Sequence, residues 1–307
     1  MVNMVEDAGV TVYCHAWGSE ALMEGNRVIG VTFQSKEGRK AILASKVIDC
    51  TGDGDIFASA GCAYEKEYSG DDRSYNVSVV FRLGNVDSEE FRNWKYDPNS
   101  HYRDKLAEYK KLFGYRISPF VTPMKDIMWV NNFVEGKDCC NVQDLTDTEM
   151  LIRRSLNEGI EWIRENVPGF KNAFLHDTAP QLGTRGSRRL NGTYRLTMDD
   201  IAQTIEHEDT IAIIPAHRRM KYKSPIELPY GVMLPADDVE NLLTAGRCFS
   251  SAHDANDHAN LIPHCVALGE AAGAAAAVAL QSNTTFRDVD IKKVQQTLKK
   301  QGVYLPR

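Results

Sequence analysis

The sequence predicts a mixed α/β fold with α+β character, and three features lead to this prediction. Residues 10–44 alternate apolar and polar side chains between Gly and Asn turns, as in an antiparallel meander. Two short apolar segments, 46–50 and 241–245, each run into a glycine-containing turn. An alanine-rich helix begins near Pro263. At 307 residues and 43% hydrophobic content, the chain can bury a substantial core around these elements.

The N-terminal part is expected to form the meander and a buried strand. The period-two pattern predicts strands at Val10–Tyr13, Glu20–Met23, Val28–Phe33 and Ala41–Ala44. Lys46–Cys50 follows as a short buried strand that leads into the turn Thr51-Gly52-Asp53-Gly54-Asp55. A helix is expected next, over residues 56–61.

The middle of the chain has a different character. We expect a strand pair at Val77–Val80 and Phe81–Leu83, followed by a long helix over Thr146–Asn166 that Pro168 ends. The apolar residues of this helix repeat every three or four positions, as an amphipathic helix requires. This segment is interpreted as an inserted domain over residues 75–229, between flanking parts at 1–74 and 230–307.

The C-terminal part returns to a strand, Leu242–Ala245, and to the helix near Pro263. An amphipathic helix over Val289–Gln301, with Asp288 or Asp290 as its cap, is expected to end the chain.

Charge and composition argue against several classes of protein. The net charge is −6 with a pI near 5.8, and no run of Lys or Arg is longer than a pair, so we expect no nucleic-acid partner. The run Ala271–Leu280 is about half of the ~20 residues that a bilayer span needs, so we expect no membrane segment. The N-terminus does not have a signal-peptide pattern, which favours the cytoplasm. Seven irregularly spaced cysteines do not suggest a disulfide framework.

Two strand ends are candidates for one ligand site. If the strand before Gly52 and the strand before Gly246 belong to one sheet and end at the same edge, their turns could line one cofactor. Ordinary strand-to-helix turns would use the same residues. The spacing of Gly269 and Gly273 places both glycines on one helix face, which suits either a flat ligand or close packing against the backbone.

These segments together resemble the FAD-dependent oxidoreductase family, within the glutathione-reductase-type flavoproteins. The resemblance continues through Pro168–Phe170, Thr178–Gly192 and Leu196–Asp200, and so covers nearly the whole chain. It implies FAD as the cofactor and a partial FAD/NAD(P)-binding-type domain with an antiparallel meander. Residues 1–74 and 230–307 would form that domain, and residues 75–229 would be a substrate or cap domain.

The resemblance also implies which residues contact the cofactor. The helix end near Pro263 would stabilise negative charge on the reduced ring. The implied cofactor-binding residues are Thr51, Gly52, Asp53, Gly246, Arg247, Leu261, Ile262, Pro263 and Gly269.

Catalytic candidates come from a polar loop and an arginine cluster. His253 or His258, in the loop over residues 250–260, could exchange a proton beside the flavin, although a histidine simply hydrogen-bonded in the loop fits equally. The spacing of His253, His258 and His264 matches no familiar ligand pattern, so we expect no metal. Arg185 or Arg188 could orient an acidic substrate or could pair with nearby acids.

Two departures from the family pattern shape the functional hypothesis. The sequence holds no G-x-G-x-x-G turn, which the family uses for the FAD pyrophosphate. His258, Ala259 and Asn260 stand where the family is expected to place an arginine. The leading hypothesis is an FAD-dependent oxidoreductase, or its C-terminal portion or subunit, that performs a two-electron oxidation or reduction of a small organic substrate. The alternative is a non-catalytic or truncated subunit that binds no FAD alone and pairs with a partner carrying the Gly-rich unit. In either case we expect an oligomer.

Overall fold

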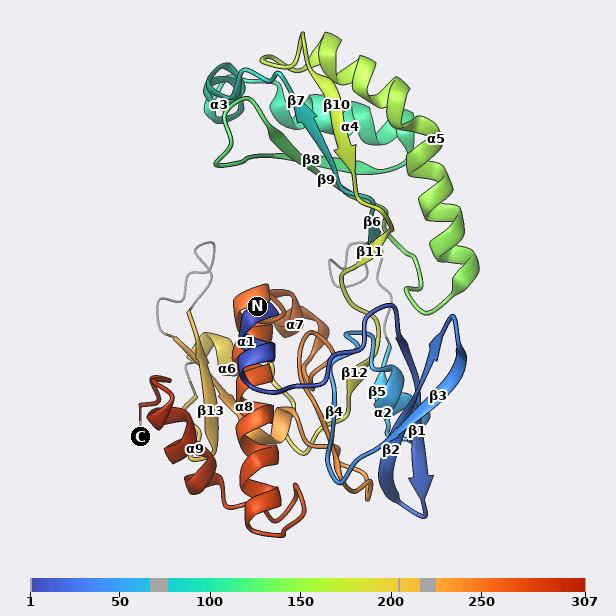
Figure 1. The fold of residues 1–307 in the computed structure, drawn as a ribbon. Helices are drawn as coiled ribbons and strands as arrows, with labels where there is room; N and C mark the ends of the chain where they lie inside the picture. The colour runs from blue at the N-terminus through green and yellow to red at the C-terminus, as the bar shows by residue number, and fades with distance from the viewer. Residues whose placement is uncertain (1, 67–76, 204, 216–224, 307) are drawn as a thin grey trace. The chain divides into compact units, whose positions relative to one another are not determined.

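The computed structural model describes residues 2–66, 77–203, 205–215 and 225–306, and its mixed helices and strands confirm the α/β class (Figure 1). The chain forms two compact units. The first unit combines residues 1–66 with 188–307, and the second unit is residues 67–187. The two divisions differ over residues 188–229, which the sequence interpretation assigned to the middle domain and the contacts place in the first unit.

In its described residues, the first unit holds one three-stranded sheet, three two-stranded sheets and most of the short helices. Its elements are α1 (Val2–Asp7), β1 (Trp17–Glu24), β2 (Arg27–Ser35), β3 (Gly38–Leu43), β4 (Val47–Asp49), α2 (Asp55–Ser59), β5 (Tyr64–Glu65), β12 (Arg189–Leu190), α6 (Met198–Gln203), β13 (Thr210–Ile214), β14 (Ile226–Pro229), the 3-10 helix η2 (Tyr230–Val232), β15 (Leu242–Thr244), α7 (His253–Ala259), α8 (Ile262–Gln281) and α9 (Ile291–Lys300). The three-stranded sheet is β1-β2-β3, and the two-stranded sheets are β12-β5, β13-β14 and β15-β4.

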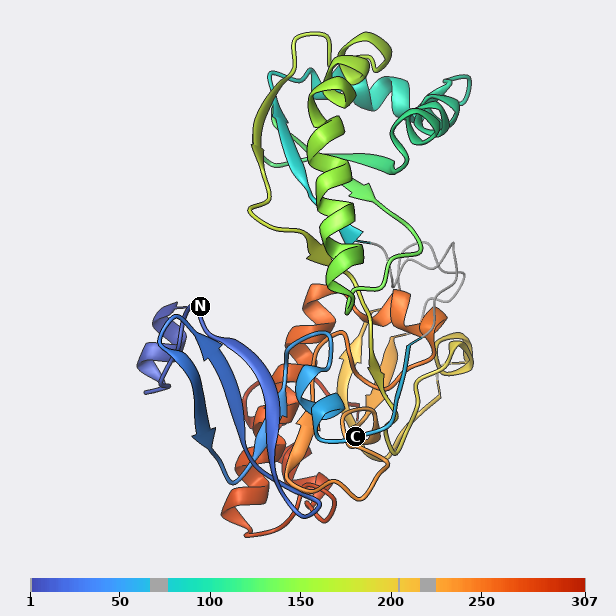
Figure 2. The ribbon, with the colours of Figure 1, turned by 90° about the vertical axis from the view of Figure 1, so that its right-hand side faces the viewer.

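The predicted meander is confirmed as the antiparallel sheet β1-β2-β3 (Figure 2). The strand predicted at Val10–Tyr13 is wrong. Val10 and Val12 are 54% and 56% exposed and belong to no strand. An alternating pattern produces a strand only where a neighbouring strand can accept its backbone hydrogen bonds, and these residues have none among the described elements.

Strands β4 and β15 pair in parallel, as the two-strand-end interpretation requires. Val47 lies opposite Leu242 and Asp49 lies opposite Thr244. The Val47 amide donates to Asn241 O at 2.9 Å, and the Ala245 amide donates to Asp49 O at 2.9 Å. Parallel strands end on the same side of a sheet, so the turns after Asp49 and Thr244 lie at one edge.

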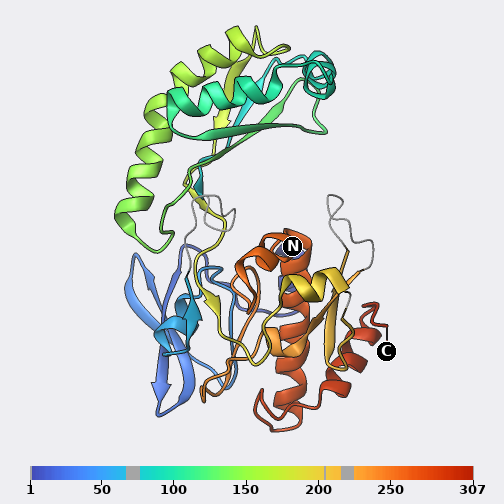
Figure 3. The ribbon, with the colours of Figure 1, turned by 180° about the vertical axis from the view of Figure 1, so that it is seen from behind.

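Helix α8 packs closely against β13 and α9 (Figure 3). Its buried residues include Leu268, Ala271, Ala272, Ala275 and Ala279, and the small side chains let the helix approach its neighbours closely. The expected C-terminal helix is confirmed as α9, and Asp290 caps it by accepting from the amides of Lys292 and Lys293.

Helix α8 is also long and apolar enough to cross a membrane, and within the described ranges it alone passes that test. Half of its most apolar 18-residue window is buried in the structure. Core helices of soluble proteins share this length and composition, so the feature is weak evidence for a membrane span.

The second unit is an antiparallel sheet of order β10-β7-β9-β8 with helices α4 and α5 packed on one face. Its elements are β6 (Val77–Ser78), β7 (Phe81–Gly84), α3 (Ser88–Tyr96), α4 (Tyr102–Phe113), β8 (Arg116–Val121), β9 (Met128–Phe133), α5 (Val142–Asn166), β10 (Phe174–Thr178) and β11 (Gly183–Thr184).

Two sequence predictions in this unit need correction. Strands β6 and β7 do not pair with each other: β6 pairs with β11, and β7 lies between β10 and β9. Residues 79–80, which separate the two strands, form neither a turn nor a bend, so β6 and β7 cannot pair as a hairpin. Helix α5 begins before the predicted Thr146, because the side chain of Asn141 accepts hydrogen bonds from the amides of Gln143 and Asp144.

A chain of buried hydroxyl groups joins α4 to α5. The hydroxyl of Tyr109 lies 3.1 Å from that of Tyr115, which lies 3.2 Å from Ser155 Oγ. Gly159 of α5 faces this chain, and a Cβ at that position would collide with the Tyr109 hydroxyl. The glycine therefore makes room for a buried ring that cannot move without breaking its hydrogen bond.

We expect Gly159→Ala to lower the free energy of unfolding by about 1–3 kcal/mol, because the added methyl overpacks a filled core. Gly273→Ala in α8 is the control, since a Cβ there meets no described atom within 4 Å. The control should stabilise the chain by about 0.5–1 kcal/mol through helix propensity. Urea unfolding measures both changes, and a stabilising Gly159→Ala would contradict the packing argument.

Candidate functional site

The turn after β4 is built on two glycines in the left-handed region. Gly52 has a φ of 82° and Gly54 a φ of 70°, conformations that cost other residues free energy. A Cβ on Gly52 would collide with the guanidinium of Arg247, and one on Gly54 would collide with the ring of Phe57. Glycine is therefore required here for backbone conformation and for close approach.

Arg247 ties the two strand-end turns together. Its Nη2 atom lies 3.0 Å from Asp53 Oδ2, and both side chains are less than a third exposed. Asn256 of α7 donates its Nδ2 hydrogen bond to the main-chain oxygen of Arg247 at 3.0 Å. The structure thus brings together Gly52, Asp53 and Arg247, which the sequence analysis proposed as parts of one site.

The second carboxylate of the turn is paired with another predicted residue. Arg188 Nη1 lies 2.9 Å from Asp55 Oδ1 and also donates to Asp53 O at 3.0 Å. Burial raises the pKa of Asp55, although the hydrogen bond and the charge of Arg188 act against this rise. Arg188 therefore supports the turn.

Arg189 follows Arg188 directly in the sequence, and the structure gives it a different environment. Its side chain is 2% exposed, its Nε donates to Ser251 O at 3.1 Å, and its Nη2 lies 3.6 Å from Glu65 Oε2. This guanidinium joins β12 to the segment before α7. Burial distinguishes it from Arg188, and the sequence carries no signal for that difference. Arg185 lies in the second unit, directly after β11, and is half-buried.

The polar segment before α8 is not only a loop. Residues His253–Ala259 form helix α7, whose buried face consists of Ala255, Asn256 and Ala259. His253 and His258 are half-buried and lie outside that face. Across the described ranges, no group of three His, Cys, Asp or Glu side chains has an arrangement that could hold a metal ion.

Helix α8 begins without a side-chain cap from Leu261, its N-cap residue, in the described structure, and Pro263 occupies its first turn. Ile262 is 82% exposed. A Cβ on Gly246, Gly269 or Gly273 would meet no described atom within 4 Å. The described residues therefore do not use Gly269 and Gly273 for close packing, and that face of α8 is open to a ligand or another chain.

The thiols near this region are not activated. Burial raises the pKa of Cys248 and of Cys265 above the ordinary value. Both are therefore thiols at neutral pH and poor nucleophiles.

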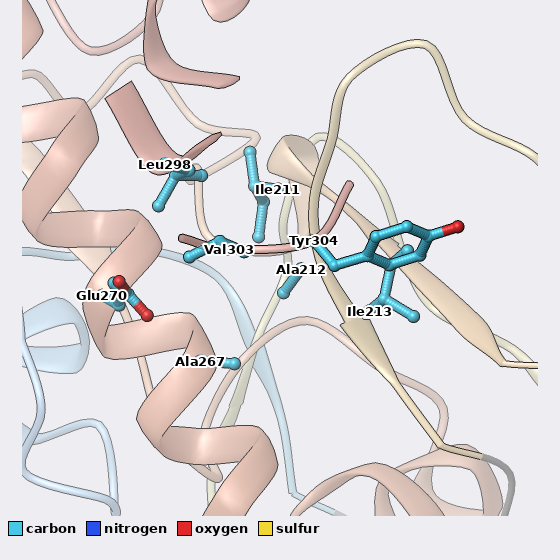
Figure 4. A pocket seen from close by; sticks show the side chains of 8 residues that line it. All are labelled: Ile211, Ala212, Ile213, Ala267, Glu270, Leu298, Val303 and Tyr304. Carbon is cyan, nitrogen blue, oxygen red and sulfur yellow. The ribbon is translucent and has the colours of Figure 1, made fainter. Parts of the chain in front are cut away.

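A cavity of about 200 Å³ lies elsewhere in the first unit, and none of the predicted site residues lines it. Figure 4 shows side chains from α8, from β13 and from the C-terminal segment around it. Glu270 is the charged residue among the eight that line it. A mainly apolar cavity of this size offers no place for FAD, so we do not assign it to the cofactor.

We expect Arg188→Met to lower the free energy of unfolding at pH 7 by about 1–3 kcal/mol, because it leaves a partly buried carboxylate without its cation. The pKa of Asp55 is raised in the fold. Stability linked to such a group is fully present below its unfolded pKa and is lost as pH rises through the folded pKa. The deficit of Arg188→Met should therefore shrink between pH 7 and about pH 4.

Urea unfolding at both pH values measures this effect. The double variant Arg188→Met with Asp55→Asn is the control and should show little pH dependence of the deficit. An equal deficit of Arg188→Met at both pH values would contradict the assigned pairing.

Structural comparisons give only remote similarity. A triple mutant of a flavin-dependent brominase is 11% identical, with a TM-score of 0.42 over 97% of this chain and 58% of that chain. A geranylgeranyl bacteriochlorophyll reductase-like protein from Thermoplasma acidophilum is 14% identical, with a TM-score of 0.47 over 97% and 57%. A myxobacterial chondrochloren halogenase, described as FAD-dependent, is 12% identical, with a TM-score of 0.44 over 98% and 53%.

This chain therefore spans little more than half the length of these three solved structures. No curated protein matches the chain significantly. The model of the family described as FAD dependent oxidoreductase matches residues 1–298, nearly the whole chain. The chain therefore belongs to the FAD dependent oxidoreductase family.

Proposed function

We propose that the chain holds FAD at the carboxyl ends of β4 and β15 and takes part in the two-electron oxidation or reduction of a small organic substrate. The observation that carries this proposal is the parallel pairing of the two strands, which places the turns at Gly52 and Gly246 at one sheet edge. Arg247 and Asp53 then link those turns directly.

The residues at this edge fit a flavin. Gly246 has a φ of 94° and no described atom within 4 Å of a Cβ, so its backbone can lie against a ligand. The first-turn amides of an α-helix have no partner within the helix, and they carry its positive end. In α8 the Leu261 side chain leaves these amides uncapped within the described structure. Such donors suit the electron-rich pyrimidine side of the ring.

Each predicted residue then has a role. FAD supplies the two-electron chemistry when it is bound. Arg247 and Asp53 hold the two turns in register, and Leu261–Pro263 with Gly269 form the surface beside the ring. The imidazole of His253 or His258 exchanges the proton that accompanies substrate oxidation or reduction. Arg185 or Arg188 orients a substrate carboxylate, since a guanidinium binds carboxylates in a bidentate manner.

The open face of α8 allows a direct test of cofactor binding. Purified chain mixed with excess FAD should retain the visible flavin absorption after gel filtration. Gly269→Leu should keep the apo fold, because the space around Gly269 is open, but should raise the Kd for FAD at least about tenfold by filling the cofactor's place.

Gly273→Leu, one turn further along the same face, is the matched control and should change the Kd less. A wild-type chain that stays colourless after FAD addition would refute cofactor binding by this chain alone. Equal Kd values for the wild type and Gly269→Leu would contradict the proposal that α8 contacts the cofactor.

A second proposal, pairing with a partner chain, rests on the other edge of β4. Val47 and Asp49 direct their hydrogen-bonding groups to β15, so those of Ile48 face the opposite side. Within the described part of the chain, β15 is the strand that pairs with β4, and none pairs with that opposite edge. An unpaired strand edge favours the addition of another strand. A partner polypeptide that carries a Gly-rich FAD-binding unit could supply it.

Ile48→Pro tests this edge, because proline removes the outward amide and leaves the bonds of Val47 and Asp49 to the β15 segment in place. We expect the wild-type chain to form oligomers or aggregates in size-exclusion chromatography. Ile48→Pro should shift it toward monomer with an unchanged circular dichroism spectrum. A monomeric wild-type chain at every concentration would contradict self-association through this edge.

A further inference from the structure

The carboxylate of Asp49 gathers four hydrogen bonds at the end of β4. Its Oδ1 accepts from the Thr51 amide at 2.9 Å and from Thr51 Oγ1 at 2.7 Å. Its Oδ2 accepts from the amides of Ile56 at 3.1 Å and Phe57 at 2.9 Å. The residue is 1% exposed, so it reaches neither solvent nor a ligand directly.

These bonds replace a normal helix cap. The N-cap position of α2 is Gly54, which has no side chain to bond to the first amides of the helix. Such amides normally take an acceptor from the N-cap residue itself. Here the acceptor comes from Asp49, five positions earlier in the sequence, across the turn 51–55. One carboxylate therefore holds both the start of this turn and the helix that follows it.

The main chain of the same residue contacts the second turn. Asp49 O accepts from the Ala245 amide at 2.9 Å and from Thr244 Oγ1 at 3.1 Å. The position of Gly52 beneath the Arg247 guanidinium depends on how these two turns lie relative to each other. A shift in the Asp49 carboxylate would move Gly52 and Asp53 while Ala245 and Arg247 stayed with β15.

We infer that Asp49 is the positioning residue of the cofactor site, acting through Thr51, Gly52 and Asp53 rather than by contact with FAD. The inference rests on the proposed binding of FAD at this edge. The buried carboxylate of Asp49 holds the turn in the position in which Asp53 can pair with Arg247. In this position the turn backbone can also face the cofactor.

Asp49→Asn provides the test. Asparagine has the same shape, but it has one acceptor oxygen and a donor group in place of the second oxygen. Two of the four amide and hydroxyl donors therefore lose their acceptor. We expect the Kd for FAD to rise at least tenfold at a temperature well below the melting point, a change of about 1.4 kcal/mol.

Asp290→Ala is the control, because alanine removes a helix cap away from the turn. Asp290 caps α9 in the same unit by accepting from the amides of Lys292 and Lys293, and α9 packs on α8 and β13 rather than on the turn. This variant should lower the melting temperature but leave the FAD Kd and the spectrum of bound flavin unchanged. A purely structural Asp49 would behave like Asp290.

Hydrogen exchange of the apo chain gives a second readout that does not need FAD. Asp49→Asn should speed amide exchange in residues 51–57, which the carboxylate holds. It should leave the amide of Ala245 protected, because that amide donates to the main-chain oxygen of Asp49, which asparagine keeps. Exchange in residues 51–57 that equals that of the wild type would overturn the inference. So would a Kd equal to that of the wild type. If the wild type binds no FAD, the proposed function fails, and the exchange pattern still decides the role of Asp49.

Thr51→Val is a milder variant in case Asp49→Asn does not fold. It removes the hydroxyl that donates to Asp49 Oδ1 and accepts from the Asp55 amide, and it preserves the side-chain shape. Its expected effects have the same direction and a smaller size. Unchanged FAD affinity and unchanged exchange in residues 51–57 would count against the inference.

Discussion

The parallel pairing of β4 with β15 is the constraint on which the candidate site depends. Thr244 Oγ1 bonds to Asp49 O across 195 positions of sequence. Parallel strands require a long connection, because the chain must return to the starting end of the sheet before it runs alongside again. Here that connection contains the whole second unit. The two glycine turns meet because the strands run in the same direction.

Charge balance makes the turn compatible with an anionic ligand. Asp53 and Asp55 lie two residues apart in a partly buried turn, where two uncompensated carboxylates would repel each other and any phosphate group. Arg247 pairs with Asp53, and Arg188 pairs with Asp55. Both arginines come from segments distant in sequence, so the turn becomes electrically neutral only after the first unit has assembled. A partly buried ion pair is costly to break from one side, which gives each arginine a structural role as well.

Helix α8 serves two purposes through its small residues. On its buried side, alanines bring the helix close to the core. On its open side, Gly269 and Gly273 leave a surface that no described atom approaches closely. A larger residue on the first side would overpack the core, whereas on the second side it would meet open space. The same composition thus gives close packing on one face and an open surface on the other.

Local patterns in the sequence by themselves determined the meander, the long helix α5, the last helix and the two glycine turns, because alternation, helical periodicity and glycine conformation act over a few residues. They also carried the family resemblance and FAD as the cofactor. Tertiary structure decided what depends on distant partners. Val10–Tyr13 has the pattern of a strand but no strand beside it, and β6 and β7 find partners other than each other. Arg189 is buried and Arg188 is not, although the two are adjacent in the sequence. The carboxylate of Asp49 accepts the amides of α2 only when α2 folds back over β4. Hydrogen-bond partners and burial are set by the whole fold, which no local pattern encodes.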